Sequence, residues 1–471
     1  MLFRSDWQDE VFRSSINSNY HVNITGGNEN TLFAFGVGYL GHEGLVENTS
    51  FNRYSTRANA KIKMTDWFRL NANVSFVYSE RDLKFEGMSR NYNPVLAGLI
   101  KAPFTSAYVY NMLGEETPNF EGIDVFNISN PKVLTDNSSS ENNRFRFFGG
   151  LNAEIRFNPY LKADLIFGLT SDKVTRERVF LPNAGIYHTA LASGEITNQS
   201  QQLRNSFSLV NTEAVLSYTR NFDNLHDLTA RLGSRILNGK NELDWGKAYN
   251  TSSDEMQTLG DGRNTLAQVG GMLGSWTSIS NYLNVEYGYS NRYFLSLNAA
   301  LDGSSRFGKN ADGIRISNNV FGLFPSLNGA WIVSAEEFMA DQNFFDLIKV
   351  RAGYSVSGND DIGNYSARYY YEPQVLLGAY GLVRANIPND QLKWETNRKA
   401  TVGFDFAMFR ERLNLSIDLY NSTTHDLIGI NSITPATGMS ISLSNDGSLR
   451  NRGIDVNING RVIDQDRKSV V

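Results

Sequence analysis

The feature that most constrains this chain is a strict alternation of apolar and polar residues in many short segments. In residues 53–64 the even-numbered positions are mostly apolar and end with Ile62 and Met64, whereas the odd-numbered positions, including Arg57, are all polar. Residues 68–78 repeat the pattern, with apolar or aromatic residues at every even-numbered position and polar residues at the odd-numbered positions except Val77. Successive side chains of a β-strand point to opposite faces, so these segments predict strands with one apolar and one wet face.

The same alternation recurs in about fifteen segments, each near the roughly 9–11 residues that a tilted strand needs to cross a bilayer. No stretch approaches the ~18 consecutive apolar residues that would predict a membrane-spanning helix. The pattern therefore indicates an all-β, antiparallel architecture. The predicted strands are residues 20–25, 32–40, 53–64, 68–78, 144–157, 160–170, 211–219, 226–234, 282–289, 292–302, 327–333, 347–355, 399–408, 413–421 and 454–462.

The connections between these strands alternate between short and long, as they do in outer-membrane barrels with short periplasmic turns and long external loops. A soluble sandwich has no reason to sort its loops in this way, so the sequence predicts a transmembrane β-barrel. The short connections are 27–30, 65–67, 158–159, 221–225, 290–291, 409–412 and the longer 334–346, which has a helical pattern at 335–340. The long ones are 79–143, 171–206, 235–281, 303–324, 356–396 and 422–451, with 41–52 intermediate.

The two faces of the predicted strands differ in charge. Arg or Lys at a lipid-facing midplane position costs ~2–4 kcal/mol, and the apolar faces of residues 53–64 and 68–78 carry no charged residue. Aromatic residues near strand ends fit interfacial girdles. The wet faces are expected to line a lumen or contact a plug, and the candidate residues for that role are Arg57, Arg144, Arg146, Glu154, Arg156, Lys349 and Arg351.

Composition and motifs argue against other classes of function. The net charge of −5 does not favour nucleic-acid binding, and the absence of cysteine excludes disulfides, thiol chemistry and Cys-based zinc sites. The G-x-G-x-x-G match at 36–41 lies inside an alternating strand rather than before a helix. The histidines and adjacent acidic residues show no ligand or catalytic spacing, so we expect no enzyme, no catalytic residue, no metal and no cofactor. Calcium binding at 359–361 stays an open alternative.

Aromatic residues in the long connections are candidates for contacts with a ligand or partner. Tyrosine and tryptophan rings stack on sugars and clamp peptides, and the alternative is packing within the loops or in the outer girdle. The candidates are Trp276, Tyr365, Tyr369, Tyr370, Tyr371 and Tyr380.

Seven stretches, in the order of a known family, resemble the SusC/RagA-like TonB-dependent outer-membrane transporters of Bacteroidetes. They are residues 6–13, 53–76, 291–308, 324–339, 348–365, 392–428 and 445–460. The resemblance implies a barrel of roughly twenty-two strands with an N-terminal plug that engages TonB. It also implies an outer-membrane lipid environment, a SusD-like surface lipoprotein as partner, and a glycan or peptide as substrate.

The resemblance predicts TonB-dependent active import of an oligosaccharide or peptide. Open alternatives are a passive porin, a secreted β-rich glycan-binding protein, and signalling through an N-terminal extension. The chain shows no signal peptide, TonB box, plug or final family strands, so residues 1–465 are expected to be an incomplete outer-membrane barrel domain that cannot close. Residues 466–471 resemble a translated sequencing adapter and are expected to be a non-native tail.

Overall fold

The computed structural model describes residues 5–192, 194–263, 266–376 and 379–461. One antiparallel sheet takes fifteen strands in chain order, and each segment predicted as a strand overlaps one of them, running at most two residues past its end; residue 462, predicted as strand, lies outside the described residues. These strands are β1 (Asn17–Gly27), β2 (Thr31–Glu43), β3 (Ser50–Lys63), β4 (Phe68–Asp82), β7 (Ser139–Arg156), β8 (Leu161–Leu181), β9 (Gln199–Phe222), β10 (His226–Tyr249), β11 (Gln268–Tyr289), β12 (Tyr293–Ser304), β14 (Asn319–Ile332), β15 (Phe345–Asn359), β18 (Glu395–Met408), β19 (Leu413–Ser432) and β20 (Ile441–Gly460).

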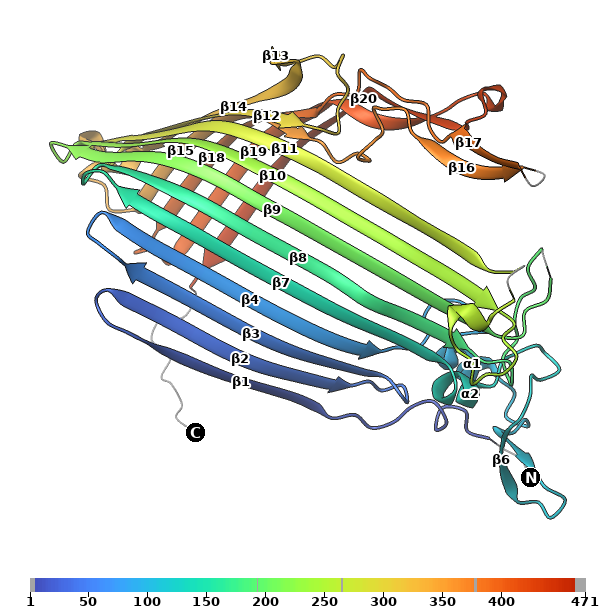
Figure 1. The fold of residues 1–471 in the computed structure, drawn as a ribbon. Coiled ribbons are helices and arrows are strands. Elements are labelled where there is room, and N and C mark those ends of the chain that lie inside the picture. The colour runs from blue at the N-terminus through green and yellow to red at the C-terminus, as the bar shows by residue number, and fades with distance from the viewer. Residues whose placement is uncertain (1–4, 193, 264–265, 377–378, 462–471) are drawn as a thin grey trace, which may run out of the picture.

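The sheet curves into an open trough, with β15, β18 and β19 behind β10 and β11 (Figure 1). Within the described residues β1 pairs only with β2, and β20 pairs only with β19. Among the described residues the wall is therefore not closed. Among the described residues, no helix has the length and apolar character needed to span a membrane.

Tight turns join the strands at one end of the trough. Ser290 and Asn291 have φ values of 53° and 52°, the left-handed values that a type I′ hairpin turn requires at both central residues. Asp223 and Asn224 adopt the same conformation in the turn between β9 and β10. The longer turn after β14 holds two 3-10 turns, Val333–Ala335 and Glu337–Met339, in place of the helical pattern predicted at 335–340.

The opposite end differs from the prediction, because the strands continue well past the alternating segments. β9 and β10 each contain 24 residues, and β8 extends to Leu181, so much of the predicted loops 171–206 and 235–281 is strand. The loop 422–451 is likewise mostly β19 and β20, which leaves only residues 433–440 as a connection. The alternation of apolar and polar residues stops at the edge of the predicted membrane band. The ladder of backbone hydrogen bonds continues beyond it in water, because backbone pairing needs no apolar face.

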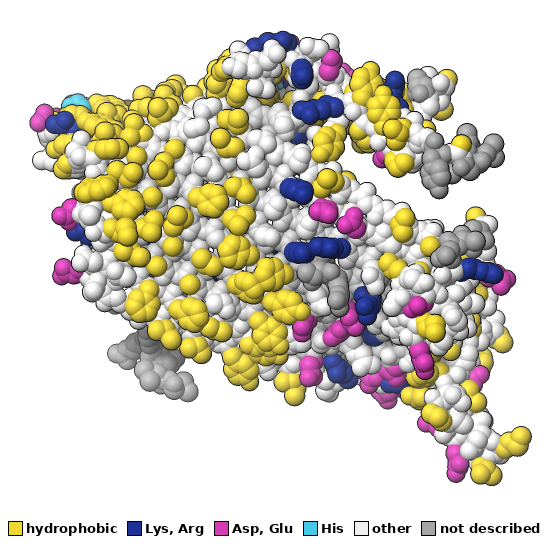
Figure 2. All heavy atoms as spheres, in the orientation of Figure 1, with side chains coloured by type: hydrophobic (Ala, Val, Ile, Leu, Met, Phe, Trp, Pro, Cys, Tyr) yellow, Lys and Arg dark blue, Asp and Glu magenta, His cyan; other side chains and the backbone are white. Residues whose placement is uncertain are grey.

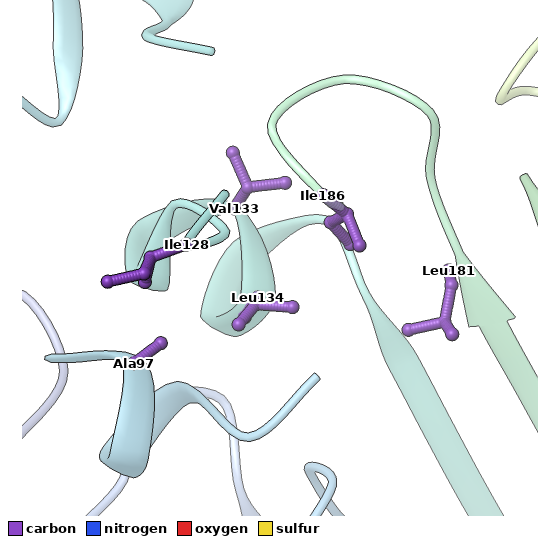
Figure 3. Close-up of a cluster of buried hydrophobic side chains, with 6 residues drawn as sticks. All are labelled: Ala97, Ile128, Val133, Leu134, Leu181 and Ile186. Carbon is purple, nitrogen blue, oxygen red and sulfur yellow. The ribbon is translucent and has the colours of Figure 1, made fainter. Parts of the chain in front are cut away.

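A compact structure, which we call the loop cap, lies at this end and comprises residues 5–16, 83–138, 182–192 and 194–198. It contains α1 (Pro94–Ile100), α2 (Pro131–Asp136) and a small hairpin of β5 (Tyr108–Tyr110) and β6 (Glu116–Phe120). Asn93 and Asn130 cap the two helices, and a proline occupies the first helical position of each. Its core packs Ala97, Ile128, Val133, Leu134 and Ile186 against Leu181 at the end of β8 (Figure 3).

The remaining short elements lie in the connections between the later strands of the sheet. The hairpin of β16 (Tyr371–Leu376) and β17 (Ala379–Arg384) projects at the loop end (Figure 1), and β13 (Ile314–Ile316) pairs with β14. Short 3-10 turns occupy Leu259–Asp261 and Pro435–Thr437. A second small core, formed by Phe307, Ile362, Ala367 and Leu392, packs the segment after β12 against segments that lie between β15 and β18.

Candidate functional site

The outer face of the wall is apolar between two rows of aromatic rings. Tyr20, Tyr39, Tyr54 and Tyr78 lie directly opposite one another on β1 to β4, with neighbouring ring centroids 5.2–6.5 Å apart. Near the tight turns, Tyr289, Tyr293 and Trp331 form a second row with centroids 6.2–6.3 Å apart. Hydrophobic side chains cover the wall, and charged groups gather toward the loop end (Figure 2). Such an arrangement fits a bilayer with interfacial aromatic girdles.

The inner face carries charges that are paired across strands. Glu154 on β7 lies within 3.8 Å of Arg69 and forms closer ion pairs with Arg156 and Lys162. Lys162 also lies 3.1 Å from Asp164. The predicted lumen residues Glu154 and Arg156 therefore share one network on the polar face.

A second network lies nearer the loop end, where Arg144 and Arg146 both bind the carboxylate of Asp172 on β8. Asp172 was missed in the sequence analysis because the predicted strand stopped at residue 170. Continuing the even-numbered polar positions of residues 160–170, which include Lys162 and Asp164, would have placed Asp172 on the same face, and the structure puts it directly opposite Arg146.

The third network is on the far side of the trough. Arg351 on β15 donates hydrogen bonds to Asp405 at 2.7 and 2.9 Å and lies 3.0 Å from Asp418. Lys349 is directly opposite Asp405 in the β15–β18 register. Register places Arg57 on the inner face too, opposite Gly36 and Ser75. The seven predicted lumen residues thus lie on the polar face, where five of them belong to three separate ion-pair networks and Arg57 and Lys349 form no ion pair with a described residue.

The structure divides the aromatic candidates into two groups, and the first group, Trp276 and Tyr365, joins a connection to strand β11. Trp276 is on β11 rather than in a loop, and the guanidinium of Arg306 stacks 4.8 Å from its ring. Arg306 also donates to Asn364, and the neighbouring Tyr365 hydroxyl accepts from the backbone N–H of Ser275. Trp276 and Tyr365 therefore hold the segment that directly follows β15 against β11.

The second group belongs to the projecting β16–β17 hairpin. Tyr369 and Tyr371 are 61% and 57% exposed, and Tyr370 is also exposed. The Arg384 guanidinium stacks 5.0 Å from the Tyr369 ring. Tyr380 lies on β17, opposite Val375 in the backbone register. Exposed tyrosines on a supported hairpin can contact a ligand or a partner protein.

The loop cap contains a buried ion pair. The side chains of Lys101 and Asp124 are 1% and 2% exposed, with Nζ 3.4 Å from Oδ2. Lys101 also donates to the carbonyl of Ile128 and lies over the Trp7 ring, while Asp124 accepts from the backbone N–H groups of residues 126 and 128. Burial lowers the pKa of Lys101, and Asp124 opposes that change.

In the described part of the chain, no group of three His, Asp or Glu side chains could hold a metal ion. At the calcium candidate 359–361, Asp360 instead accepts from Ser304 and pairs with Arg306 at 3.7 Å. The 36–41 glycine pattern lies within β2. The predicted tail 466–471 lies outside the described residues.

Comparison with known proteins identifies a family and relatives that this chain resembles. The family described as TonB dependent receptor-like, beta-barrel matches residues 187–465. TonB-dependent receptor P3 of Formosa agariphila is 29% identical over 98% of this chain and 45% of its own length. TonB-dependent receptor SusC of Bacteroides thetaiotaomicron is 25% identical over 98% of the chain and 46% of its own length. The chain therefore spans about half the length of these relatives.

Solved structures share the fold. A structure of the RagAB peptide transporter matches 98% of this chain and 50% of its own chain, with a TM-score of 0.78 and 22% sequence identity. The siderophore receptor PiuA from Acinetobacter baumannii matches 96% of the chain with a TM-score of 0.54 and 10% identity. These similarities concern the shape of the wall.

Proposed function

Because the chain belongs to the TonB-dependent receptor-like β-barrel family, we propose that it forms part of the wall of an active nutrient importer. Proteins of this family are integral to the outer membrane, and the predicted resemblance to SusC/RagA-like TonB-dependent receptors is confirmed. The named relatives are receptors rather than enzymes. Import of an oligosaccharide or a peptide, driven through TonB, is the proposed activity of the whole protein.

The observation that carries the proposal is the two-faced wall. Its outer face has an apolar band between two aromatic rows, and its inner face has ion-pair networks around Glu154, Asp172 and Arg351. A charged inner face must contact water, a polar plug or a polar solute. This supports passage of a hydrophilic substrate, and the resemblance to SusC and RagA supports a plug, TonB and a SusD-like lipoprotein as partners.

The test uses the complete gene in its native host. We expect uptake of the substrate to be lost when TonB is deleted, when the inner-membrane proton gradient is collapsed, or when the plug segment that contacts TonB is removed. Uptake that persists in all three conditions would identify a passive porin and sink the import mechanism while leaving the fold intact.

The Tyr369–Tyr371 cluster is proposed to contact the substrate or the surface lipoprotein. Replacing Tyr369, Tyr370 and Tyr371 with alanine in the full-length protein should weaken binding about tenfold, because exposed aromatic anchors dominate many interfaces. Binding is measured on purified transporter with and without its lipoprotein. Tyr110→Ala, in the β5–β6 hairpin, is the matched control, and unchanged affinity in the triple variant would contradict this role.

A further inference from the structure

An open pocket of about 460 Å³ lies on the inner face of β1 to β4 and β7. Five arginines line it and no carboxylate does: Arg53, Arg57, Arg81, Arg144 and Arg146. The pocket is therefore strongly cationic in a chain whose net charge is negative.

The strand register explains why this part of the wall is hollow. Ser75 and Ser79 on β4 lie between the arginine-bearing strands, and Ser79 stands directly between Arg53 on β3 and Arg144 on β7. On the other side, Arg57 is opposite Gly36 of β2. Small residues form the floor and long cationic side chains form the rim. Strands two apart are separated by roughly 10 Å, so guanidinium groups from β3 and β7 can both reach a group held between them.

The charge of the pocket is not balanced by the protein that the structure describes. Asp172 binds Arg144 and Arg146. No carboxylate of the described residues lies within 4 Å of the guanidinium groups of Arg53, Arg57 or Arg81, and Arg81 instead stacks 5.0 Å from the Phe51 ring. Elsewhere on the inner wall, cations such as Arg351 and Arg231 each have a carboxylate partner.

Like charges on neighbouring strands repel one another, so a cluster of this kind is destabilising until an anion is shared among its members. The guanidinium fork matches the two oxygens of a carboxylate or sulfate, with two parallel hydrogen bonds. On the outer face, the Tyr54 and Tyr78 rings lie at the same height along the strands as the pocket, at the loop end of the apolar band. The pocket thus lies in the half of the lumen that a solute arriving through the loops meets first.

We propose that this arginine pocket binds carboxylate or sulfate groups of the transported substrate, so that the nutrient is anionic. This inference rests on the proposed function as an importer and adds the chemical class of its substrate. An acidic oligosaccharide and an acidic peptide present the same groups.

The experiment measures binding to the purified full-length transporter by calorimetry. Three matched pairs of probes differ only in charge: an oligogalacturonide and its methyl ester, a sulfated and an unsulfated dextran oligosaccharide, and a glutamate-rich and a glutamine-rich peptide. We expect at least one anionic probe to bind about tenfold tighter than its neutral counterpart, with affinity falling as salt is raised. Which pair shows the preference distinguishes saccharide from peptide.

The double variant Arg53→Gln, Arg57→Gln should remove about tenfold of the anionic affinity and leave binding of the neutral probes unchanged. Arg231→Gln, which removes an inner-wall arginine that already pairs with Glu286, should leave the preference unchanged. Equal binding of charged and neutral probes, absence of binding by every probe, or an equal loss for both members of a pair would overturn the proposal.

Two further outcomes separate the pocket from its alternatives. If the double variant changes only the thermal unfolding of the ligand-free transporter, carboxylates of the protein itself occupy the pocket and the proposal is wrong. If the anion preference holds but uptake does not depend on TonB, the pocket assignment stands and the import mechanism fails.

Discussion

The loop cap and the barrel wall are stabilised by apolar residues used in opposite ways. In the cap, Val133, Leu134 and Ile186 are at most 2% exposed and pack against one another. In the wall, Leu151, Val74 and Phe76 are 39–42% exposed because they point outward from a single layer of strands. The cap behaves as a small water-soluble core, whereas the wall depends on lipid to cover its apolar face.

This difference between cap and wall shows in which surroundings each of them accommodates charged side chains. The cap holds Lys101 and Asp124 away from water, and this is tolerated because the pair and its hydrogen bonds satisfy each other. The wall keeps the ion pairs of Glu154, Asp172 and Arg351 on its inner face, whereas the outer face is apolar between the aromatic rows. The predictions below test each side of this contrast.

The largest effect is expected from breaking the buried pair. Lys101→Met leaves Asp124 as an uncompensated buried charge and should destabilise the cap by about 3–5 kcal/mol. Hydrogen exchange of the cap amides should accelerate by roughly two to four orders of magnitude, while the amides of β3 and β4 stay protected. The double variant Lys101→Met, Asp124→Leu should restore most of the protection. Equal acceleration in cap and wall would show that the cap is not an independent unit.

A slightly smaller loss of stability is expected when a charged side chain is introduced on the outer face of the wall. Leu151 is an exposed residue on the outer face of β7. The substitution Leu151→Lys should lower the free energy of unfolding by ~2–4 kcal/mol, because the ammonium group faces lipid. Its neighbour Asn152 lies on the inner face beside Asp164, so Asn152→Lys should change stability by less than about 1 kcal/mol. The measurement is urea unfolding of the full-length protein in phospholipid vesicles. Similar losses in both variants would contradict the assignment of the two faces.

The smallest effect concerns the pH dependence of the cap. Burial lowers the pKa of Lys84 to about 8, and its Nζ donates to the Ser138 carbonyl at 2.5 Å. The unfolded chain, with a lysine pKa near ~10.4, binds more protons than the folded cap between about pH 8 and that value. The stability contributed at this position therefore rises with pH across that interval and is lowest below pH 8.

Competitive amine labelling across pH 7–11 tests this directly. Lys84 in the folded protein should reach half of its maximal reactivity near pH 8, whereas the same lysine in an isolated peptide should reach it about two units higher. Coincident curves would show that burial does not shift this group. Ser138→Ala serves as a control, because it keeps the backbone carbonyl that accepts from Lys84.

Some of this protein is determined by the sequence alone. The period-two pattern predicted the fifteen strands that follow one another in chain order in the main sheet, because side-chain direction in a strand is a local property. The alternation of short and long connections predicted which end carries the turns. Residues such as Asn291, at a left-handed φ, explain why the turns are tight.

Tertiary structure alone decided the rest. The length of β9 beyond the membrane depends on backbone pairing with β8 and β10, which side-chain polarity does not encode. The buried Lys101–Asp124 pair joins residues that the sequence placed in one undivided loop. The contrast between Arg144, which has Asp172, and Arg57, which has no carboxylate partner among the described residues, depends on which strands lie side by side. Cross-strand register sets those distances, and no single segment of the chain contains it.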